Sequence, residues 1–254
     1  MKRLLGIIAV FIIMFCKLTL ASPSLFPFNP EWTATELNTH LASGADPNER
    51  GAMQWTPLMA AAALDSPPHL LDILINAGAD VNAQDYMNRT ALMLAAESNT
   101  HPEVITLLIK AGSDLHALSE SKDPPLIFAI TKNNTPEITA ALLKAGADPN
   151  GVDEFGRTPL MEAVAWNIEP AVVHVLLSAG AQVHARDNIG RTPLMHAAAF
   201  GTNPEIVELL LAAGANVSSQ SNEGKTALDY AKGNAKTDNK ADIISLLIDA
   251  SSQP

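Results

Sequence analysis

The stretch that decides the fold reads RTPLMHAAAF at residues 191–200 and NPEIVELLLAAGAN at residues 203–216. Thr192 suits the N-cap of a helix, and Pro193 suits its first position, where no backbone donor is needed. Pro204 opens a second helix in the same way. Gly214 can end that helix, because glycine adopts the left-handed conformation of a C-terminal cap.

This pattern of paired helices returns with a fixed step of 34 residues, which is marked by Gly44, Gly78, Gly112, Gly146, Gly180 and Gly214. Prolines keep the same step at Pro68, Pro102, Pro136, Pro170 and Pro204. A period of this length indicates a repeat protein built from stacked helix pairs.

The second helix of each pair carries an apolar stripe with a helical period. The predicted apolar positions lie two, five, six and nine residues beyond the proline, as at Leu70, Ile73, Leu74 and Ala77. Small residues such as Ala197 and Ala198 line the first helices and let neighbouring helices approach closely. Because no pair can bury its stripe alone, stacking must form the core.

Three segments carry the motif of a known family: TPLMAAA at residues 56–62, TPLMEA at 158–163 and TPLMHAA at 192–198. They resemble the Thr-Pro-Leu-His-x-Ala signature of the ankyrin repeat family. GADVNA at residues 78–83 and GADPN at 146–150 are similar to its inter-repeat linker. The resemblance implies an all-α repeat solenoid of stacked helix-turn-helix ankyrin repeats with hairpin-like inter-repeat loops.

The 34-residue step predicts the boundaries of each unit. These are a signal peptide (1–21), an N-terminal cap or half repeat (22–50), ankyrin repeats 1 to 5 (51–84, 85–118, 119–152, 153–186, 187–220) and a C-terminal capping repeat (221–254). Repeat 3 departs most from the pattern, because Pro124 replaces the capping threonine and Lys122 replaces the usual glycine. We therefore expect an atypical turn at residues 119–123.

Residues 1–21 have the layout of a secretory signal peptide. Lys2 and Arg3 precede an apolar run at residues 4–15, and Ala21 offers a small residue for cleavage. Lys17 cuts the apolar run short of the ~20 residues that span a bilayer, which favours cleavage over the alternative of an uncleaved anchor. Cleavage would remove Cys16, the only cysteine, as suits an oxidising compartment. The sequence thus predicts a periplasmic or secreted protein that does not insert into the membrane after cleavage.

The charge of the mature chain bounds its partners. After loss of three basic residues with the signal peptide, 13 basic residues face 27 acidic ones. Such a surface repels nucleic-acid phosphates and anionic lipids and favours a basic protein partner by electrostatic steering.

No catalytic or metal-binding pattern survives scrutiny. GKT at residues 224–226 is similar to the end of a phosphate-binding loop, but Ser219 stands where its first glycine is required. His116 and His184 occupy equivalent places two units apart, too distant to share one metal. Glu162 and His196 hold matching places in adjacent units and are interpreted as a surface pair. We therefore predict no catalytic residue, no metal, no cofactor and no enzymatic activity.

Binding residues are expected on the inter-repeat loops and on the exposed edge of the first helices, which ankyrin-like arrays use for partners. Aromatic residues and arginines, the types enriched at interface hot spots, recur there. The predicted protein-binding set is Trp55, Leu64, Tyr86, Met87, Arg89, Phe155, Arg157, Trp166, Ile189, Arg191 and Phe200. For Trp166 and Phe200 the alternative is that they merely cover the inter-helix loops of their own repeats.

The function that these observations favour is a monomeric, exported interaction module, an adaptor that stabilises or positions an envelope protein. An inhibitor or immunity protein that blocks an enzyme or toxin is the alternative within the same class. A hydrolase with an unrecognised site is the alternative from another class.

Overall fold

The computed structural model describes residues 23–133, 135–166, 168–233 and 239–252. The predicted signal peptide lies outside these residues. Within them, every regular element is helical, and no helix is long and apolar enough to cross a membrane. The predicted all-α repeat solenoid is confirmed.

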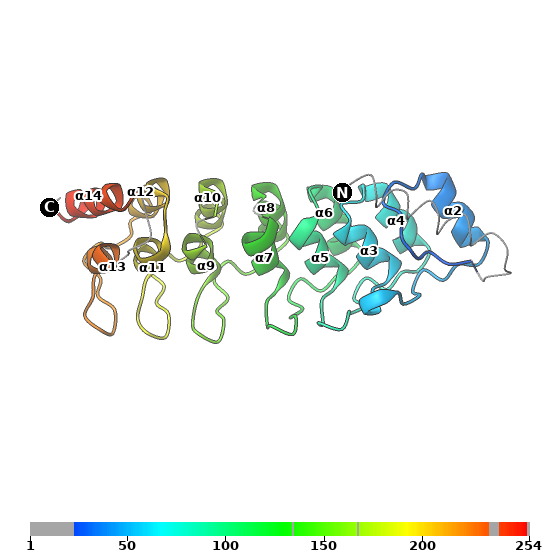
Figure 1. The fold of residues 1–254 in the computed structure, drawn as a ribbon, viewed down its shortest axis with the longest axis horizontal. Coiled ribbons are helices and arrows are strands. Elements are labelled where there is room, and N and C mark those ends of the chain that lie inside the picture. Colours follow the sequence, from blue (N-terminus) through cyan, green and yellow to red (C-terminus); the bar gives the residue numbers. More distant parts are fainter. Residues whose placement is uncertain (1–22, 134, 167, 234–238, 253–254) are drawn as a thin grey trace, which may run out of the picture.

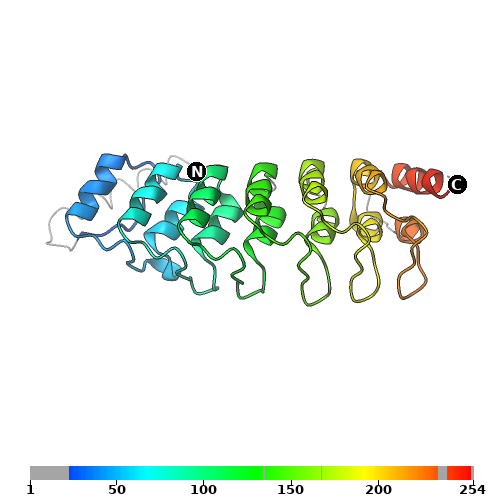
Figure 2. The same cartoon turned by 180° about the vertical axis from the view of Figure 1, so that it is seen from behind.

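The helices form two parallel rows (Figure 1). The first helices are α3 (Pro57–Ala63), α5 (Ala91–Ser98), α7 (Pro125–Phe128), α9 (Pro159–Ala165), α11 (Pro193–Phe200) and α13 (Ala227–Gly233). The second helices are α4 (Pro68–Asn76), α6 (Pro102–Lys110), α8 (Pro136–Lys144), α10 (Pro170–Ser178), α12 (Pro204–Ala212) and α14 (Lys240–Ser251). Loops project from the row of first helices, and the view from behind shows the same arrangement (Figure 2).

The N-terminal end of the stack is covered by α2 (Ala34–Ala42) and by an extended lead-in. Leu25 and Phe28 of the lead-in are buried, and the Trp32 ring stacks on His40 with centroids 4.8 Å apart. The helix α2 ends just before Gly44, the first glycine of the 34-residue series.

Threonine caps begin four of the first helices, as predicted. The hydroxyl of the N-cap threonine accepts from the amide three residues on, in the pairs Thr56–Met59, Thr90–Met93, Thr158–Met161 and Thr192–Met195. This bond satisfies one of the amides that a helix N-terminus leaves without a partner.

All second helices except α14 begin at the predicted prolines, but the predicted buried stripe is wrong at two positions. Positions two, three and six residues beyond the proline are fully buried, as at Leu70, Leu71 and Leu74. Ile73 is only partly buried, and Ala77 is exposed. Each second helix packs on the neighbouring second helices and on its own first helix, so the buried face turns toward position three, while position nine lies in the exposed helix end.

Repeat 3 is irregular in its first helix rather than in its turn. The turn at residues 119–123 closes normally, with the Ser119 amide donating to the Asp123 carbonyl at 3.1 Å. The helix after it is only one α-turn, α7, which continues as the π-helix η3 (Ala129–Asn133). Pro124 at the N-cap offers no side-chain oxygen for capping.

Candidate protein-binding face

Six five-residue turns, here called tips 1 to 6, precede the first helices at residues 51–55, 85–89, 119–123, 153–157, 187–191 and 221–225. In every tip the amide of the first residue donates to the carbonyl of the fifth, with N···O distances of 2.9–3.1 Å. The tips form one projecting edge of the stack (Figures 1 and 2). This edge and the adjoining ends of the first helices are the candidate site.

An Asp–Arg pair holds tips 2, 4 and 5. In tip 4, Asp153 Oδ1 accepts from the amides of Phe155 and Arg157 at 2.9 and 2.7 Å, and Oδ2 accepts from Arg157 Nε at 2.8 Å. The pairs Asp85–Arg89 and Asp187–Arg191 repeat this arrangement. Charge-assisted bonds of this kind fix both the loop and the guanidinium plane.

Side chains of the first helices form hydrogen bonds and ion pairs with these three tips. Arg157 Nη1 lies 2.8 Å from Glu162 Oε1, and Arg89 Nη1 lies 3.3 Å from Glu97 Oε2. In tip 5, His196 Nε2 lies 2.8 Å from Asp187 Oδ2. Each tip is therefore tied to the helix that follows it.

The interpretation of Glu162 and His196 as a surface pair is wrong. Glu162 is 8% exposed and His196 is 2% exposed. Each side chain lies beneath its own tip because the first helix directs this position inward, so Glu162 accepts from Trp166 Nε1 at 2.9 Å while His196 bonds Asp187. Burial lowers the pKa of His196, outweighing the opposite influence of its bond to Asp187. The imidazole is thus neutral near pH 7.

The predicted binding residues divide into two groups. The large side chains Leu64, Tyr86, Phe155, Trp166, Ile189 and Phe200 are 45–66% exposed. The others, Trp55, Met87, Arg89, Arg157 and Arg191, are half-buried. Trp55 Nε1 donates to Asp85 Oδ2 at 3.2 Å, and Arg89 lies 5.9 Å from the Trp55 ring centroid, so this tryptophan also braces tip 2.

Arginines lie over two of the exposed rings. The Arg157 guanidinium is 5.0 Å from the Phe155 ring centroid, and the Arg191 guanidinium is 5.7 Å from that of Phe200. Such cation–π contacts restrain rings that nonetheless stay open to solvent. The rings of Phe155 and Phe200 are therefore restrained before any partner binds.

Three further exposed apolar residues, which the sequence analysis missed, lie on the same side: Met53, Leu118 and Val152 are 47–65% exposed. Leu118 and Val152 stand where other units have Arg50, Gln84, Arg186 or Gln220. The apolar residues at two places that are polar in the other units are the sequence signal that could have identified Leu118 and Val152.

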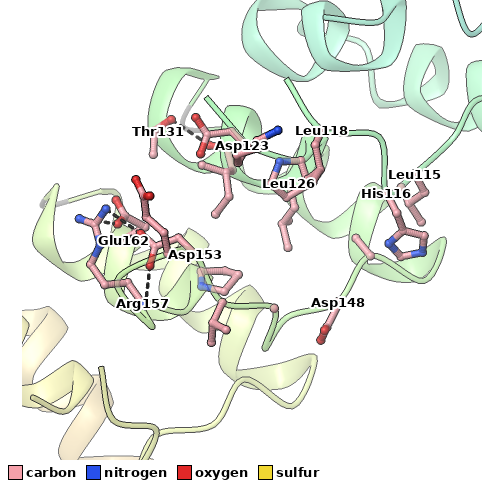
Figure 3. A pocket seen from close by; sticks show the side chains of 18 of the residues that line it. Leu115, His116, Leu118, Asp123, Leu126, Thr131, Asp148, Asp153, Arg157 and Glu162 are labelled. Carbon is pink, nitrogen blue, oxygen red and sulfur yellow. Dashed lines mark hydrogen bonds and ion pairs between the residues drawn. The ribbon is translucent and has the colours of Figure 1, made fainter. Parts of the chain in front are cut away.

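A cleft of about 630 Å³ opens between the layers of repeats 3 and 4 (Figure 3). One wall comes from the linker and tip 3 with α7 and η3, and includes Leu118, Asp123 and Thr131. The facing wall comes from the linker and tip 4 with α9, and includes Val152, Asp153 and Trp166. His116 and Glu162, which the sequence analysis did not accept as metal-binding or catalytic residues, both line this cleft. The described residues contain no cluster of three or more metal-ligating side chains.

The first helices pack less closely here than at the other junctions. The helix α7 has few contacts with α9, and the rest of the contact is made by η3, whereas the second helices α8 and α10 stay packed. Ile130 of η3 and Val164 of α9 hold the place of Ala62, Ala96 and Ala198, and both are buried. The stack therefore opens on the tip side only.

Comparison with known proteins agrees with this architecture. A family model described as ankyrin repeats (3 copies) matches residues 33–119, 99–187 and 169–254. The chain belongs to the ankyrin repeat family. Domains of this family generally mediate protein–protein interaction and are scaffolds rather than enzymes.

Two solved structures show the same fold. The ankyrin repeat domain of Bcl-3, a member of the IkappaB protein family, is 28% identical with a TM-score of 0.68, over 84% of this chain and 91% of that one. The human ASB11 ankyrin repeat domain is 24% identical with a TM-score of 0.73, over 87% of this chain and 94% of that one. A search of curated protein sequences finds no match to the chain.

Proposed function

We propose that this ankyrin-repeat chain is an exported adaptor, which binds an envelope protein non-covalently through its tip edge and so stabilises or positions it. One observation carries the proposal. Of the ten large apolar side chains exposed among the described residues, nine lie on the tips, their linkers or the ends of first helices, and only Ile248 lies on a second helix. Apolar surface gathered on one edge marks an interaction site.

Charge and export support the same proposal. Acidic residues outnumber basic ones 27 to 16 in the whole chain, so a basic partner is attracted over a long range. The apolar N-terminal segment with its small residues before Ser22 fits export and cleavage. We propose a periplasmic or secreted monomer.

The test is capture from the envelope fraction of the host on the purified chain, expressed with its own N-terminal segment. A Tyr86→Ser/Phe155→Ser/Ile189→Ser variant should lose the captured protein, since each hot-spot side chain contributes about 2 kcal/mol or more. Ile248→Ser is the matched control, because it removes exposed apolar surface from a second helix. Equal capture by wild type and the triple variant would reject the tip edge as the binding face.

A further inference from the structure

A backbone hydrogen bond joins neighbouring tips at four of the five junctions, and the described residues of tips 3 and 4 lack it. The amide of the second tip residue donates to the carbonyl of the third residue of the preceding tip at Tyr86–Met53, Glu120–Met87, Asn188–Phe155 and Asn222–Ile189. The distances are 3.4, 2.8, 2.9 and 3.0 Å. At the remaining junction, the 34-residue step pairs the Glu154 amide of tip 4 with the Ser121 carbonyl of tip 3, and these two described residues form no such bond.

The interruption leaves the groups that an extended backbone can pair with. Neither the Ser121 carbonyl nor the Glu154 amide has a hydrogen-bond partner among the described residues. Both residues are exposed. An extended peptide supplies one amide and one carbonyl at alternating positions, which is how strand addition to an open edge provides affinity.

Side-chain links across the same gap are absent as well. In other layers Asn82 and Asn150 donate to the carbonyls of Gly112 and Gly180 at 2.9 and 3.1 Å. His116 holds this position next to the cleft and makes no such bond among the described residues, and His184 makes none between tips 5 and 6. Only between tips 3 and 4 do the described residues lack both this side-chain link and the backbone bond.

Acidic and apolar side chains both line the cleft (Figure 3). Asp123, Asp148, Asp153, Glu154 and Glu162 line it, against the cations Lys122, Lys132 and Arg157. Arg157 is already engaged by Asp153 and Glu162, at 2.7 and 2.8 Å. The lining therefore keeps an excess of negative charge.

Asp123 is a partly buried carboxylate of the cleft that forms no ion pair with the other described residues. Tips 2, 4 and 5 have an arginine at this position, whereas tip 3 has this aspartate. Within the described residues no hydrogen bond or ion pair joins its carboxylate to another group. Burial and the charge of Asp153 raise the pKa of Asp123 and outweigh the opposite influence of Arg157 and Lys132, so its charged form is held at a cost. A bound cation would relieve that cost.

We infer that the cleft between tips 3 and 4 receives an extended segment of the partner protein. Its backbone pairs with the Ser121 carbonyl and the Glu154 amide, and one arginine or lysine side chain reaches Asp123. Leu118, Val152 and Trp166 contact the aliphatic stem and the flanking residues of the segment. The inference rests on the proposed binding function and specifies the chemistry of the partner.

The probe is the peptide acetyl-TVRVT-amide, titrated into the purified chain while backbone amide resonances are followed by NMR. We expect saturable shifts of the Glu154 amide and of its cleft neighbours Gly151 and Val152. A peptide with citrulline in place of arginine keeps the shape without the charge and should bind at least tenfold more weakly. Shifts confined to other tips, or equal binding of both peptides, would overturn the inference.

Two variants test the role of Asp123. Asp123→Asn should weaken peptide binding about tenfold, whereas Asp72→Asn makes the same charge change on an exposed position of α4 and should leave it unaltered. Asp123→Arg places in tip 3 the residue of the other tips, and should abolish binding while the circular dichroism spectrum stays unchanged. Peptide binding by Asp123→Arg equal to wild type would also overturn the inference.

The outcome is separable from that of the envelope capture. If the peptide fails to bind but capture still depends on Tyr86, Phe155 and Ile189, only the cleft inference falls. If the peptide binds with the expected charge dependence and capture is independent of those residues, the tip-edge proposal falls and the cleft stands.

Discussion

The junction between repeats 4 and 5 and the junction between repeats 3 and 4 use the same 34-residue frame with different results. At the first, Asn188 joins tips 4 and 5 twice, through its amide to the Phe155 carbonyl at 2.9 Å and through Nδ2 to the Glu154 carbonyl at 3.0 Å. At the second, Glu154 holds the equivalent position, and its carboxylate cannot donate. One junction is closed, and the other is a cleft.

Packing of the first helices differs in the same direction. Ala198 of α11 lets this helix lie close to α9, whereas contacts between α7 and α9 are few, and the equivalent places there are held by the buried side chains of Ile130 in η3 and Val164 in α9. The second helices pack at both junctions. The comparison teaches that in a stack of short repeats a few exchanged side chains can open one layer locally without breaking the array, because each repeat contacts only its neighbours.

The largest expected effect comes from overpacking the closed junction. Ala198→Leu should lower the free energy of unfolding by about 1–3 kcal/mol, because the buried site between first helices has no room for added methylenes. Thr131→Leu, on the wall of the cleft, should change it by about 0.5 kcal/mol or less. Urea denaturation measures both. Equal losses would mean that the cleft is closed in solution.

The sequence predicts features that local residues determine better than features that depend on contacts between repeats. The helices, their caps and their glycine ends are local, so Thr192, Pro193 and Gly214 suffice to place them. The cleft arises from absent contacts between layers. Its apolar walls become readable only when Leu118 and Val152 are compared with Arg186 in register, while the missing backbone bond has no such signal, because Glu120 makes that bond in tip 3 and Glu154 does not in tip 4. The bracing of tips by Glu162 and His196 depends on the inward direction of one helical position, which an apolar period does not reveal for polar residues.

A smaller effect is expected from the caps. Thr192→Ala should cost about 1 kcal/mol, because the Met195 amide loses its acceptor. Pro124→Thr should restore in repeat 3 the cap that the other repeats have, and raise the free energy of unfolding by about 0.5–1 kcal/mol. Thermal and urea unfolding of both variants measure the changes. A loss of stability in Pro124→Thr would show that the short α7 has a cause other than its N-cap.

A fall in pH should change the stability contributed by His196 and by Asp123 in opposite directions. His196 has a lowered pKa in the folded protein, so the unfolded chain binds more protons, and the stability contributed by neutral His196 is lost as pH falls from about 7 through the folded pKa. Asp123 has a raised pKa, so the folded protein gains stability as pH falls through that value. Melting temperatures between pH 7 and pH 5 should fall less for His196→Gln than for wild type. Parallel curves would show that His196 is not the titrating group.

The smallest effect concerns one backbone conformation in the open junction. Lys122 has a φ of 67°, at the place where tips 4, 5 and 6 have Gly156, Gly190 and Gly224. A left-handed conformation costs a residue with a Cβ roughly 1–2 kcal/mol, while glycine pays roughly 0.5–1 kcal/mol in chain entropy. Lys122→Gly should therefore raise the free energy of unfolding by about 0.5 kcal/mol.

Asn88 is the matched control, because it holds the same place in tip 2 with a φ of 56°. Asparagine visits the left-handed region at little cost, so Asn88→Gly should leave the free energy of unfolding unchanged or lower it slightly. If the two glycine variants shift it alike, the strain does not belong to tip 3, and the open junction differs from the others by its missing cross-links. If only Lys122→Gly gains stability, then tip 3 adds a backbone cost of its own to a junction that is already held on one side alone.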